Sequence, residues 1–117
     1  MASGSWDDVI SYYKESLNHG RMRPEFHTHI TGMLEVIPAL RNFAPLKSLS
    51  PFTSHASLCF KLPNNSDTLY IWYEGNDQFN VYIYRPDLGE FGTNIAERTV
   101  ERENLLDTLE EFLTQYG

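Results

Sequence analysis

Cysteine is nearly missing from this sequence, since Cys59 is its single copy. One thiol cannot form an intramolecular disulfide, and it cannot supply a zinc site built from paired cysteines. The sequence also has no apolar stretch long enough to span a bilayer. Its start, from Met1 to Ser5, lacks the basic and apolar regions of a secretory signal. We therefore expect a protein of a reducing, cytoplasmic environment.

Basic residues are also scarce, because 9 Lys and Arg stand against 16 Asp and Glu, giving a formal net charge of -7. Nucleic acids and anionic membrane surfaces repel such a chain, so we expect neither as a partner. A cationic protein is the partner that this charge favours. The alternative interpretation is that the acidic excess serves solubility alone.

Motifs for catalysis and cofactor binding are missing as well. The sequence has no glycine-rich phosphate loop and no nucleophile elbow. His27 and His29 are two residues apart, so on a helix they point to different sides and cannot chelate one ion. Ser54 and His55 are adjacent, which does not give the opposed geometry of a nucleophile and its base. We therefore expect no cofactor and no metal, and we rank an enzyme last among the functions.

The residues that are present have the pattern of one globular domain over residues 1–117. Aromatic residues make up 14% of the chain, which argues against disorder. Apolar residues at helical spacing predict a first helix over Trp6–Asn18. Ser5 is its expected N-cap with Asp8 as capping-box partner, and His19–Gly20 is its expected stop.

A second helix is predicted to begin at Pro24, a residue that suits the first helical position. Its apolar stripe consists of Phe26, Ile30, Met33, Leu34 and Ile37. Pro38 is expected to kink this helix or to start a new turn that ends at Phe43. A strand within residues 28–37 is the alternative, and residues 45–54 are expected to be irregular.

Three segments in the middle of the chain alternate apolar and polar residues with period two, which is typical of strands. They span Ser57–Leu62, Thr68–Glu74 and Gln78–Arg85, and short polar turns separate them. The short turns predict an antiparallel meander. A turn at Gly75–Asp77 pairs Tyr73 with Phe79, Ile71 with Val81, Leu69 with Ile83, and Tyr70 with Tyr82.

Two further elements complete the predicted fold. Residues 95–100 form an expected fourth strand, and a stripe of Leu105, Leu106, Leu109, Phe112, Leu113 and Tyr116 predicts a C-terminal helix. The sequence thus predicts an α+β fold with an antiparallel meander sheet of three to four strands. The N-terminal helices and the C-terminal helix pack on one face of this sheet, in the order α-α-β-β-β-(β)-α.

The two faces of the predicted sheet differ in character. The apolar face carries Leu58, Phe60, Leu62, Leu69, Ile71, Tyr73, Phe79, Val81 and Ile83. The opposite face, here called the aromatic face, carries Tyr70, Trp72, Tyr82 and Tyr84 beside Asn80, Glu74, Lys61 and Cys59. Aromatic residues of this kind are enriched in protein interfaces. The alternatives are that residues 24–51 fold across this face, or that a second copy of the chain covers it.

These features predict a non-enzymatic protein-binding module, with its partner a cationic protein or a second copy. The expected binding residues are Tyr70, Trp72, Tyr82 and Tyr84, with Glu74, Asp67 and Asp77 at the rim. In size, charge and layout the chain resembles the small acidic immunity proteins with which bacteria mask cationic toxins. The alternative is a carrier of a planar or apolar ligand, held between sheet and helices with help from His27, His29 or His55.

Overall fold

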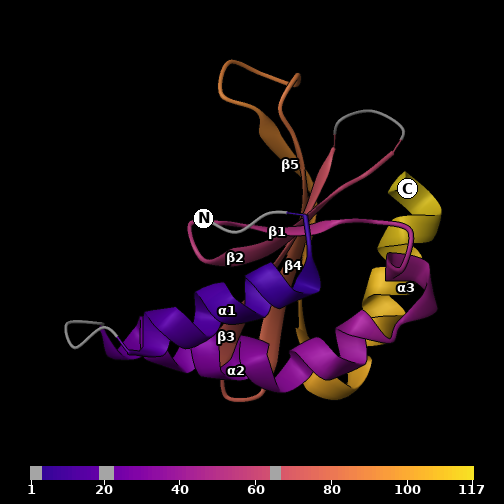
Figure 1. Ribbon diagram of the computed structural model, residues 1–117. Helices are drawn as coiled ribbons and strands as arrows, with labels where there is room; N and C mark the ends of the chain where they lie inside the picture. Colours follow the sequence, from indigo (N-terminus) through magenta and orange to yellow (C-terminus); the bar gives the residue numbers. More distant parts are fainter. Residues whose placement is uncertain (1–3, 19–22, 64–66) are drawn as a thin grey trace.

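The computed structural model describes residues 4–18, 23–63 and 67–117. Its elements in chain order are α1 (Trp6–Leu17), α2 (Pro24–Arg41), the 3₁₀ turn η1 (Ala44–Leu46), β1 (Pro51–Ser54), β2 (Ser57–Lys61), β3 (Thr68–Gly75), β4 (Gln78–Arg85), β5 (Thr93–Glu101), the 3₁₀ turn η2 (Arg102–Asn104) and α3 (Leu105–Tyr116). The strands form one antiparallel sheet in the order β1-β2-β3-β4-β5 (Figure 1). This arrangement confirms the predicted α+β meander.

Helix α1 begins where its sequence predicts. The Ser5 side chain accepts a hydrogen bond from the Asp8 N–H at 3.1 Å, so one of the free N–H groups of the first turn is satisfied. The carboxylates of Asp7 and Asp8 lie at the positive end of the helix dipole. The helix ends at Leu17, one residue earlier than predicted, and the expected stop at His19–Gly20 lies outside the described residues.

Helix α2 begins at Pro24 and continues past Pro38 to Arg41. A proline inside a helix removes one hydrogen bond and costs about 3 kcal/mol. Val36, Ile37 and Leu40 on either side of Pro38 are buried in the core, and their burial offsets this cost. Of our two alternatives for Pro38, the new turn is not formed, because the helix continues to Arg41, and the alternative strand within residues 28–37 is not formed either.

The register of the central strands is the predicted one. Tyr73 pairs with Phe79, Ile71 with Val81, Leu69 with Ile83 and Tyr70 with Tyr82. The turn between β3 and β4 contains Asn76 and Asp77, whose φ angles of 54° and 62° are left-handed. Asn and Asp tolerate this conformation well, which explains why these residue types occupy the turn.

Strand β1 corrects our expectation that residues 45–54 are irregular. Pro51–Ser54 pairs with β2 through a two-residue turn made by His55 and Ala56. Both residues have left-handed φ angles, 51° and 70°, which a hairpin turn of this length requires. Neither is Gly, Asn or Asp, so the sequence carries no turn signal here. The final strand, Thr93–Glu101, is also longer than predicted, and the described part of the chain forms a sheet of five strands in place of three to four.

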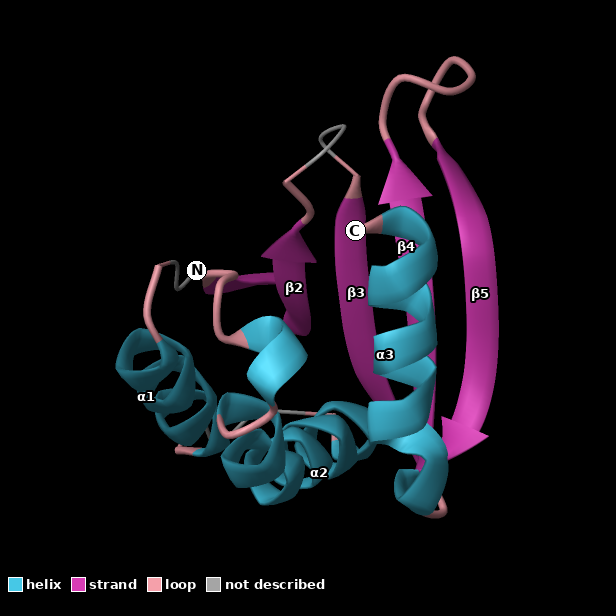
Figure 2. Cartoon of the chain, turned by 90° about the vertical axis from the view of Figure 1, so that its right-hand side faces the viewer, coloured by secondary structure: helices cyan, strands magenta, loops and turns pink. Residues whose placement is uncertain are grey.

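The core lies on the apolar face of the sheet. Helix α3 covers this face over β3 and β4 (Figure 2), and Trp6 of α1 packs on Phe60 of β2 with ring centroids 5.7 Å apart. Eight of the nine predicted residues of this face belong to the buried core cluster, and the ninth, Tyr73, is partly buried and packs against it. This packing leaves the aromatic face on the other side of the sheet.

Candidate functional site

A single cross-strand row defines the centre of the aromatic face. The pairing places Phe52 opposite Cys59, Cys59 opposite Tyr70, Tyr70 opposite Tyr82, and Tyr82 opposite Glu97. Residues directly opposite one another in a sheet point to the same side. The row therefore changes from apolar at β1, through two tyrosines, to a carboxylate at the β5 edge.

The two tyrosines of this row form a stacked pair. Their ring centroids are 4.7 Å apart and the ring planes differ by 5°. The Tyr84 ring meets Tyr70 edge-on, with centroids 6.2 Å apart and an interplanar angle of 87°. All three rings remain partly exposed. The chain's own helices therefore do not bury this part of the aromatic face.

Trp72 is different, because helix α2 reaches it. The His29 ring lies flat on the indole, with centroids 3.5 Å apart, and Phe26 meets the indole edge-on at 5.9 Å. Phe26 itself is 40% exposed. The alternative in which residues 24–51 cover the aromatic face is thus realised at Trp72 alone among its four aromatic residues.

The fit of α2 against β3 follows from a gap in the sheet. Strand β2 pairs with β3 only from Thr68 to Ile71, so among the described residues no strand lies beside the rest of β3 on that side. Helix α2 takes its place, and Gly32 allows this because a Cβ there would overlap the Tyr73 ring. The Tyr73 N–H donates to Nδ1 of His29 at 3.0 Å, so a side chain replaces the missing strand as acceptor.

Acidic groups line the β5 side of the aromatic face. Glu97 is exposed and accepts a hydrogen bond from the Asn80 amide at 3.1 Å, while Glu101 is exposed opposite Gln78. Burial raises the pKa of Tyr82 to about 12, with further contributions from Tyr70, Cys59 and Glu97. The Tyr82 hydroxyl is therefore neutral at physiological pH and lies within electrostatic reach of the Glu97 carboxylate.

The three predicted rim carboxylates have three different environments. Asp67 corrects our expectation, because it is fully buried and both its oxygens accept hydrogen bonds from Arg85 at 3.0 Å. A buried carboxylate needs such a partner, so Asp67 is not available to a binding protein. Glu74 is exposed. Asp77 is also exposed, but it pairs with Arg102 at 2.6 Å.

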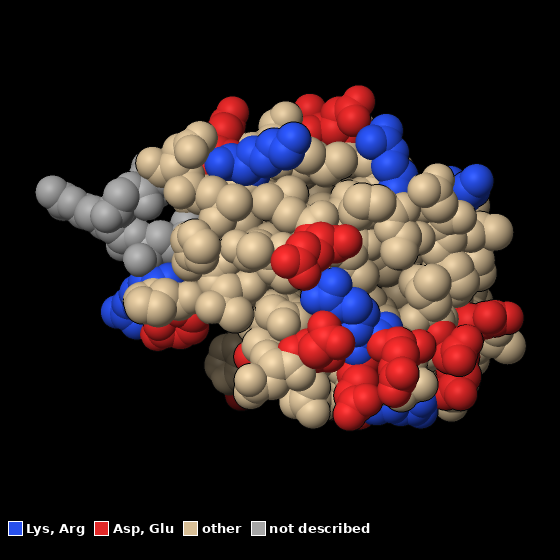
Figure 3. All heavy atoms as spheres, turned by 90° about the horizontal axis from the view of Figure 1, so that it is seen from below, with Lys and Arg blue, Asp and Glu red and all other residues tan. Residues whose placement is uncertain are grey.

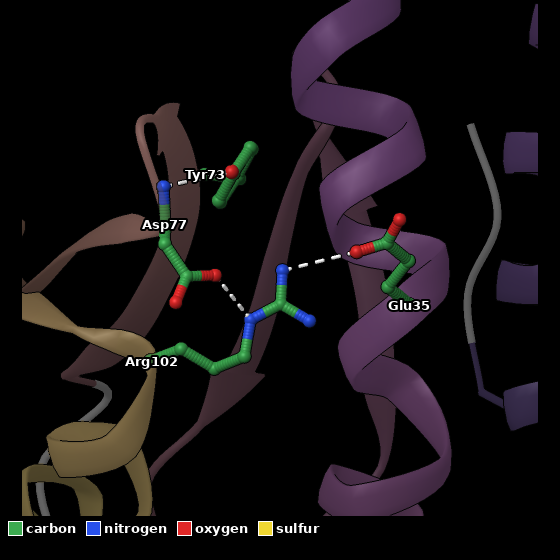
Figure 4. Close-up of polar contacts among 4 residues, drawn as sticks. All are labelled: Glu35, Tyr73, Asp77 and Arg102. Atoms are coloured by element: carbon green, nitrogen blue, oxygen red, sulfur yellow. Dashed lines mark hydrogen bonds and ion pairs between the residues drawn. The ribbon is translucent and has the colours of Figure 1, made fainter.

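Arg102 is the centre of a small ionic cluster. Its guanidinium contacts Asp77 of the β3–β4 turn and Glu35 of α2, the latter at 3.0 Å (Figure 4). The Asp77 N–H in turn donates to the Tyr73 hydroxyl at 2.9 Å. On the underside of the molecule, acidic and basic side chains are interspersed in this way (Figure 3). The cluster joins three elements, and because its single guanidinium faces two carboxylates, one negative charge is left in excess.

An apolar loop that the sequence did not predict lies beside the aromatic face. Residues 86–92 connect β4 to β5 and extend beyond the sheet, away from α3 (Figure 1). The loop exposes Phe91 by 83% and Leu88 by 47%. Tyr84 holds it in place, since its hydroxyl donates to the Phe91 carbonyl at 2.6 Å. A phenylalanine between Gly89 and Gly92 was the available signal, because glycines mark a loop in which a large apolar side chain lacks a core to enter.

The described residues give little support for a metal site, a reactive cysteine or an enclosed ligand pocket. Within the described ranges, no group of three His, Cys, Asp or Glu residues is placed to hold a metal ion. Cys59 is buried, and burial raises the pKa of its thiol to about 12, so it is protonated and unreactive at neutral pH. His29 has both nitrogens bonded within the chain, and the hollow of about 240 Å³ beside His27 is open to solvent.

Comparisons with protein-family models, curated proteins and solved structures find no match. In the part of the chain that the structure describes, no helix is both long and apolar enough to cross a membrane. The arrangement of side chains is therefore the basis for any functional conclusion.

Proposed function

We propose that this chain is a non-enzymatic protein-binding module whose aromatic face engages a cationic segment of a partner protein. The observation that carries the proposal is the stacked pair of Tyr70 and Tyr82, which stays partly exposed beside the Glu97 carboxylate. An aromatic surface that the chain itself leaves partly open is typical of an interaction site.

The chemistry of this surface fits lysine or arginine side chains. A tyrosine ring attracts a cation to its face, and a nearby carboxylate neutralises the charge that the partner brings. Glu97 and Glu101 supply such carboxylates on the β5 side. The net charge of -7 also accelerates encounter with a basic partner over a longer distance.

The loop with Phe91 adds an apolar anchor to the same surface. Tyr84 belongs to the aromatic face and also bonds the loop backbone, so the two features form one continuous surface. Because the loop is already held in place, a partner does not have to order it on binding. Exposed aromatic anchors of this type commonly carry most of the binding energy.

A second copy of the chain is a less favourable occupant. Each copy carries a net charge of -7, with Glu97 and Glu101 on the β5 side of its aromatic face. Like charges placed close together at an interface cost free energy. A basic segment gains electrostatic free energy from the same carboxylates, as expected for an immunity-like protein that masks a cationic partner.

An octa-arginine peptide is a suitable probe, with titration calorimetry as the readout. We expect Tyr82→Leu and Glu97→Gln each to weaken binding by about threefold to tenfold. Glu110→Gln is the matched control, since it removes the same charge from the exposed side of α3. Equal weakening by Glu97→Gln and Glu110→Gln would show that only net charge matters, and would contradict the proposal. Self-association in sedimentation, lost in Tyr82→Leu, would instead favour a second copy.

A further inference from the structure

The His29 ring is buried, and both of its nitrogens are bonded within the chain. Nδ1 accepts the Tyr73 N–H at 3.0 Å, and Nε2 donates to the Ala56 carbonyl at 2.7 Å. A nitrogen that accepts a hydrogen bond carries no proton, so the ring is the neutral Nε2–H tautomer. The Tyr13 hydroxyl donates to the same carbonyl at 2.8 Å. The ring thus links α2 to α1, to the β1–β2 turn and to β3.

We propose that His29 is a proton-sensitive joint that controls the Trp72 end of the aromatic face, a role that rests on the proposed function of that face. Protonation places an N–H on Nδ1, where it points at the Tyr73 N–H. Two donors cannot bond each other, so the link between α2 and β3 is lost. The ring then moves away from Trp72, and the first turns of α2 separate from β3.

The surroundings of the ring offer little to stabilise its charged form. Among the titratable or charged groups on the elements packed against it are Tyr13 of α1, His55 of the β1–β2 turn, Cys59 of β2, and Tyr73 and Glu74 of β3, with Glu25 and His27 on α2 itself. Burial raises the pKa values of Tyr13 and Cys59, so both are neutral. Both glutamates are exposed, and in the described chain neither is hydrogen-bonded to the ring.

Two opposing effects act on the protonated ring. The Trp72 indole attracts an imidazolium stacked on its face. This attraction does not give the Tyr73 N–H a new acceptor. It also does not replace the hydration that the charged imidazolium loses when it is buried. Burial accordingly lowers the pKa of His29 below its ordinary value. The neutral ring therefore favours the closed arrangement, in which His29 stacks on Trp72 and α2 packs on β3. The charged ring favours an open arrangement, in which the first turns of α2 have separated from β3.

Opening of this joint weakens the aromatic face for a cationic partner. Trp72 loses the ring that holds it in position, so the surface is less preorganised. The new positive charge at His29 also repels a basic segment. We therefore expect the affinity for octa-arginine to fall on acidification from about pH 7.5 to about pH 5, while the glutamates remain ionised.

Amide hydrogen exchange measures the joint without any ligand. The protection factor of the Tyr73 amide is expected to fall about tenfold per pH unit below about pH 6.5, because opening takes up one proton. His29→Gln keeps a donor and an acceptor and does not titrate, so its Tyr73 amide should lose this dependence. His27→Gln removes an exposed histidine from the same helix and should retain it.

The outcomes separate this proposal from the proposed function. A Tyr73 protection factor that stays constant from about pH 7.5 to about pH 5 in the wild-type protein would overturn the joint, whether or not the His29 variant folds. If protection of the Tyr73 amide depends on pH but the affinity for octa-arginine is constant over that range, His29 does not control binding at the aromatic face. Absence of octa-arginine binding at both pH values, with pH-dependent protection, would contradict the binding function and leave the joint in place.

Discussion

Arg85 binds both carboxylate oxygens of Asp67 through two parallel hydrogen bonds of 3.0 Å. Asp67 is fully buried just before β3, and Arg85 is the last residue of β4. The pair therefore joins two neighbouring strands at one end of the sheet. This geometry gives the bidentate contact in which arginine is strongest.

Removal of the Asp67 charge should destabilise the protein substantially. Asp67→Asn leaves Arg85 without its carboxylate and replaces one acceptor oxygen with a donor, so we expect a loss of about 3 kcal/mol in the free energy of unfolding. Urea unfolding followed by circular dichroism measures this loss. Asp7→Asn is the control, because Asp7 is exposed where it pairs with Arg41, and its loss should cost less than about 1 kcal/mol. Similar costs in the two variants would contradict a structural role for Asp67.

Gly32→Ala should also destabilise the protein, although alanine is the better helix former. The added Cβ would overlap the Tyr73 ring, so α2 or the ring must shift. The gain of about 1 kcal/mol in helix propensity is smaller than an overpacking cost of about 1–3 kcal/mol at such a close contact. Thermal unfolding should show a lower midpoint. The double variant with Tyr73→Ala should be less destabilised than the sum of the two single variants, and simple additivity would show that the contact does not matter.

Much of the fold was predictable because its signals are local. The parity of apolar residues in β3 and β4, with a turn at Gly75–Asp77, was sufficient to pair Tyr70 with Tyr82. The helix start at Ser5 was equally local, since it depends on residues within one turn. Elements of this kind need only neighbouring residues to be recognised.

The errors concern one local turn with unusual residues and contacts between residues far apart in the chain. Strand β1 was missed because the turn at His55–Ala56 uses residues that rarely adopt left-handed φ angles. Asp67 was placed at the rim because nothing near it in sequence identifies Arg85 as its partner. The contact of His29 with Trp72 spans 43 positions, and it exists only because β2 stops pairing at Ile71.

Protein stability should decrease on acidification through His29. Burial lowers the pKa of His29 in the folded state, so the unfolded state binds more protons at mildly acidic pH. The stabilisation is complete above about pH 6.5, the unfolded value, and is lost as the pH falls toward the folded value, by at most about 1.4 kcal/mol per pH unit. Urea midpoints at about pH 7.5 and about pH 5 measure the change. The His29→Gln variant should show a smaller decrease, and an equal one would exclude His29 as its source.

Cys59 should react with a thiol reagent only when the fold opens. Burial raises the pKa of its thiol to about 12, so at about pH 8 the thiolate is scarce and the sulfur is covered. Ellman's reagent should therefore label the native protein much more slowly than the urea-unfolded protein. Immediate labelling of the native protein would show that Cys59 is accessible on the aromatic face, contrary to its burial in the structure.

Phe91→Ser separates binding from folding more cleanly than any substitution in the sheet. Because Phe91 is 83% exposed and its loop is held through its backbone carbonyl by Tyr84, we expect the urea midpoint to remain unchanged. If Phe91 anchors a partner, the affinity of the partner complex should fall by about tenfold or more. Octa-arginine has no apolar side chain to contact Phe91, so its affinity should not change.

Tyr84→Phe is the complementary variant, since it keeps the ring and removes the hydroxyl that holds the loop. Its effect should fall on the partner complex in the same direction and be smaller, because the anchor is still present but less fixed. A partner complex insensitive to Phe91→Ser would limit the interface to the aromatic face itself.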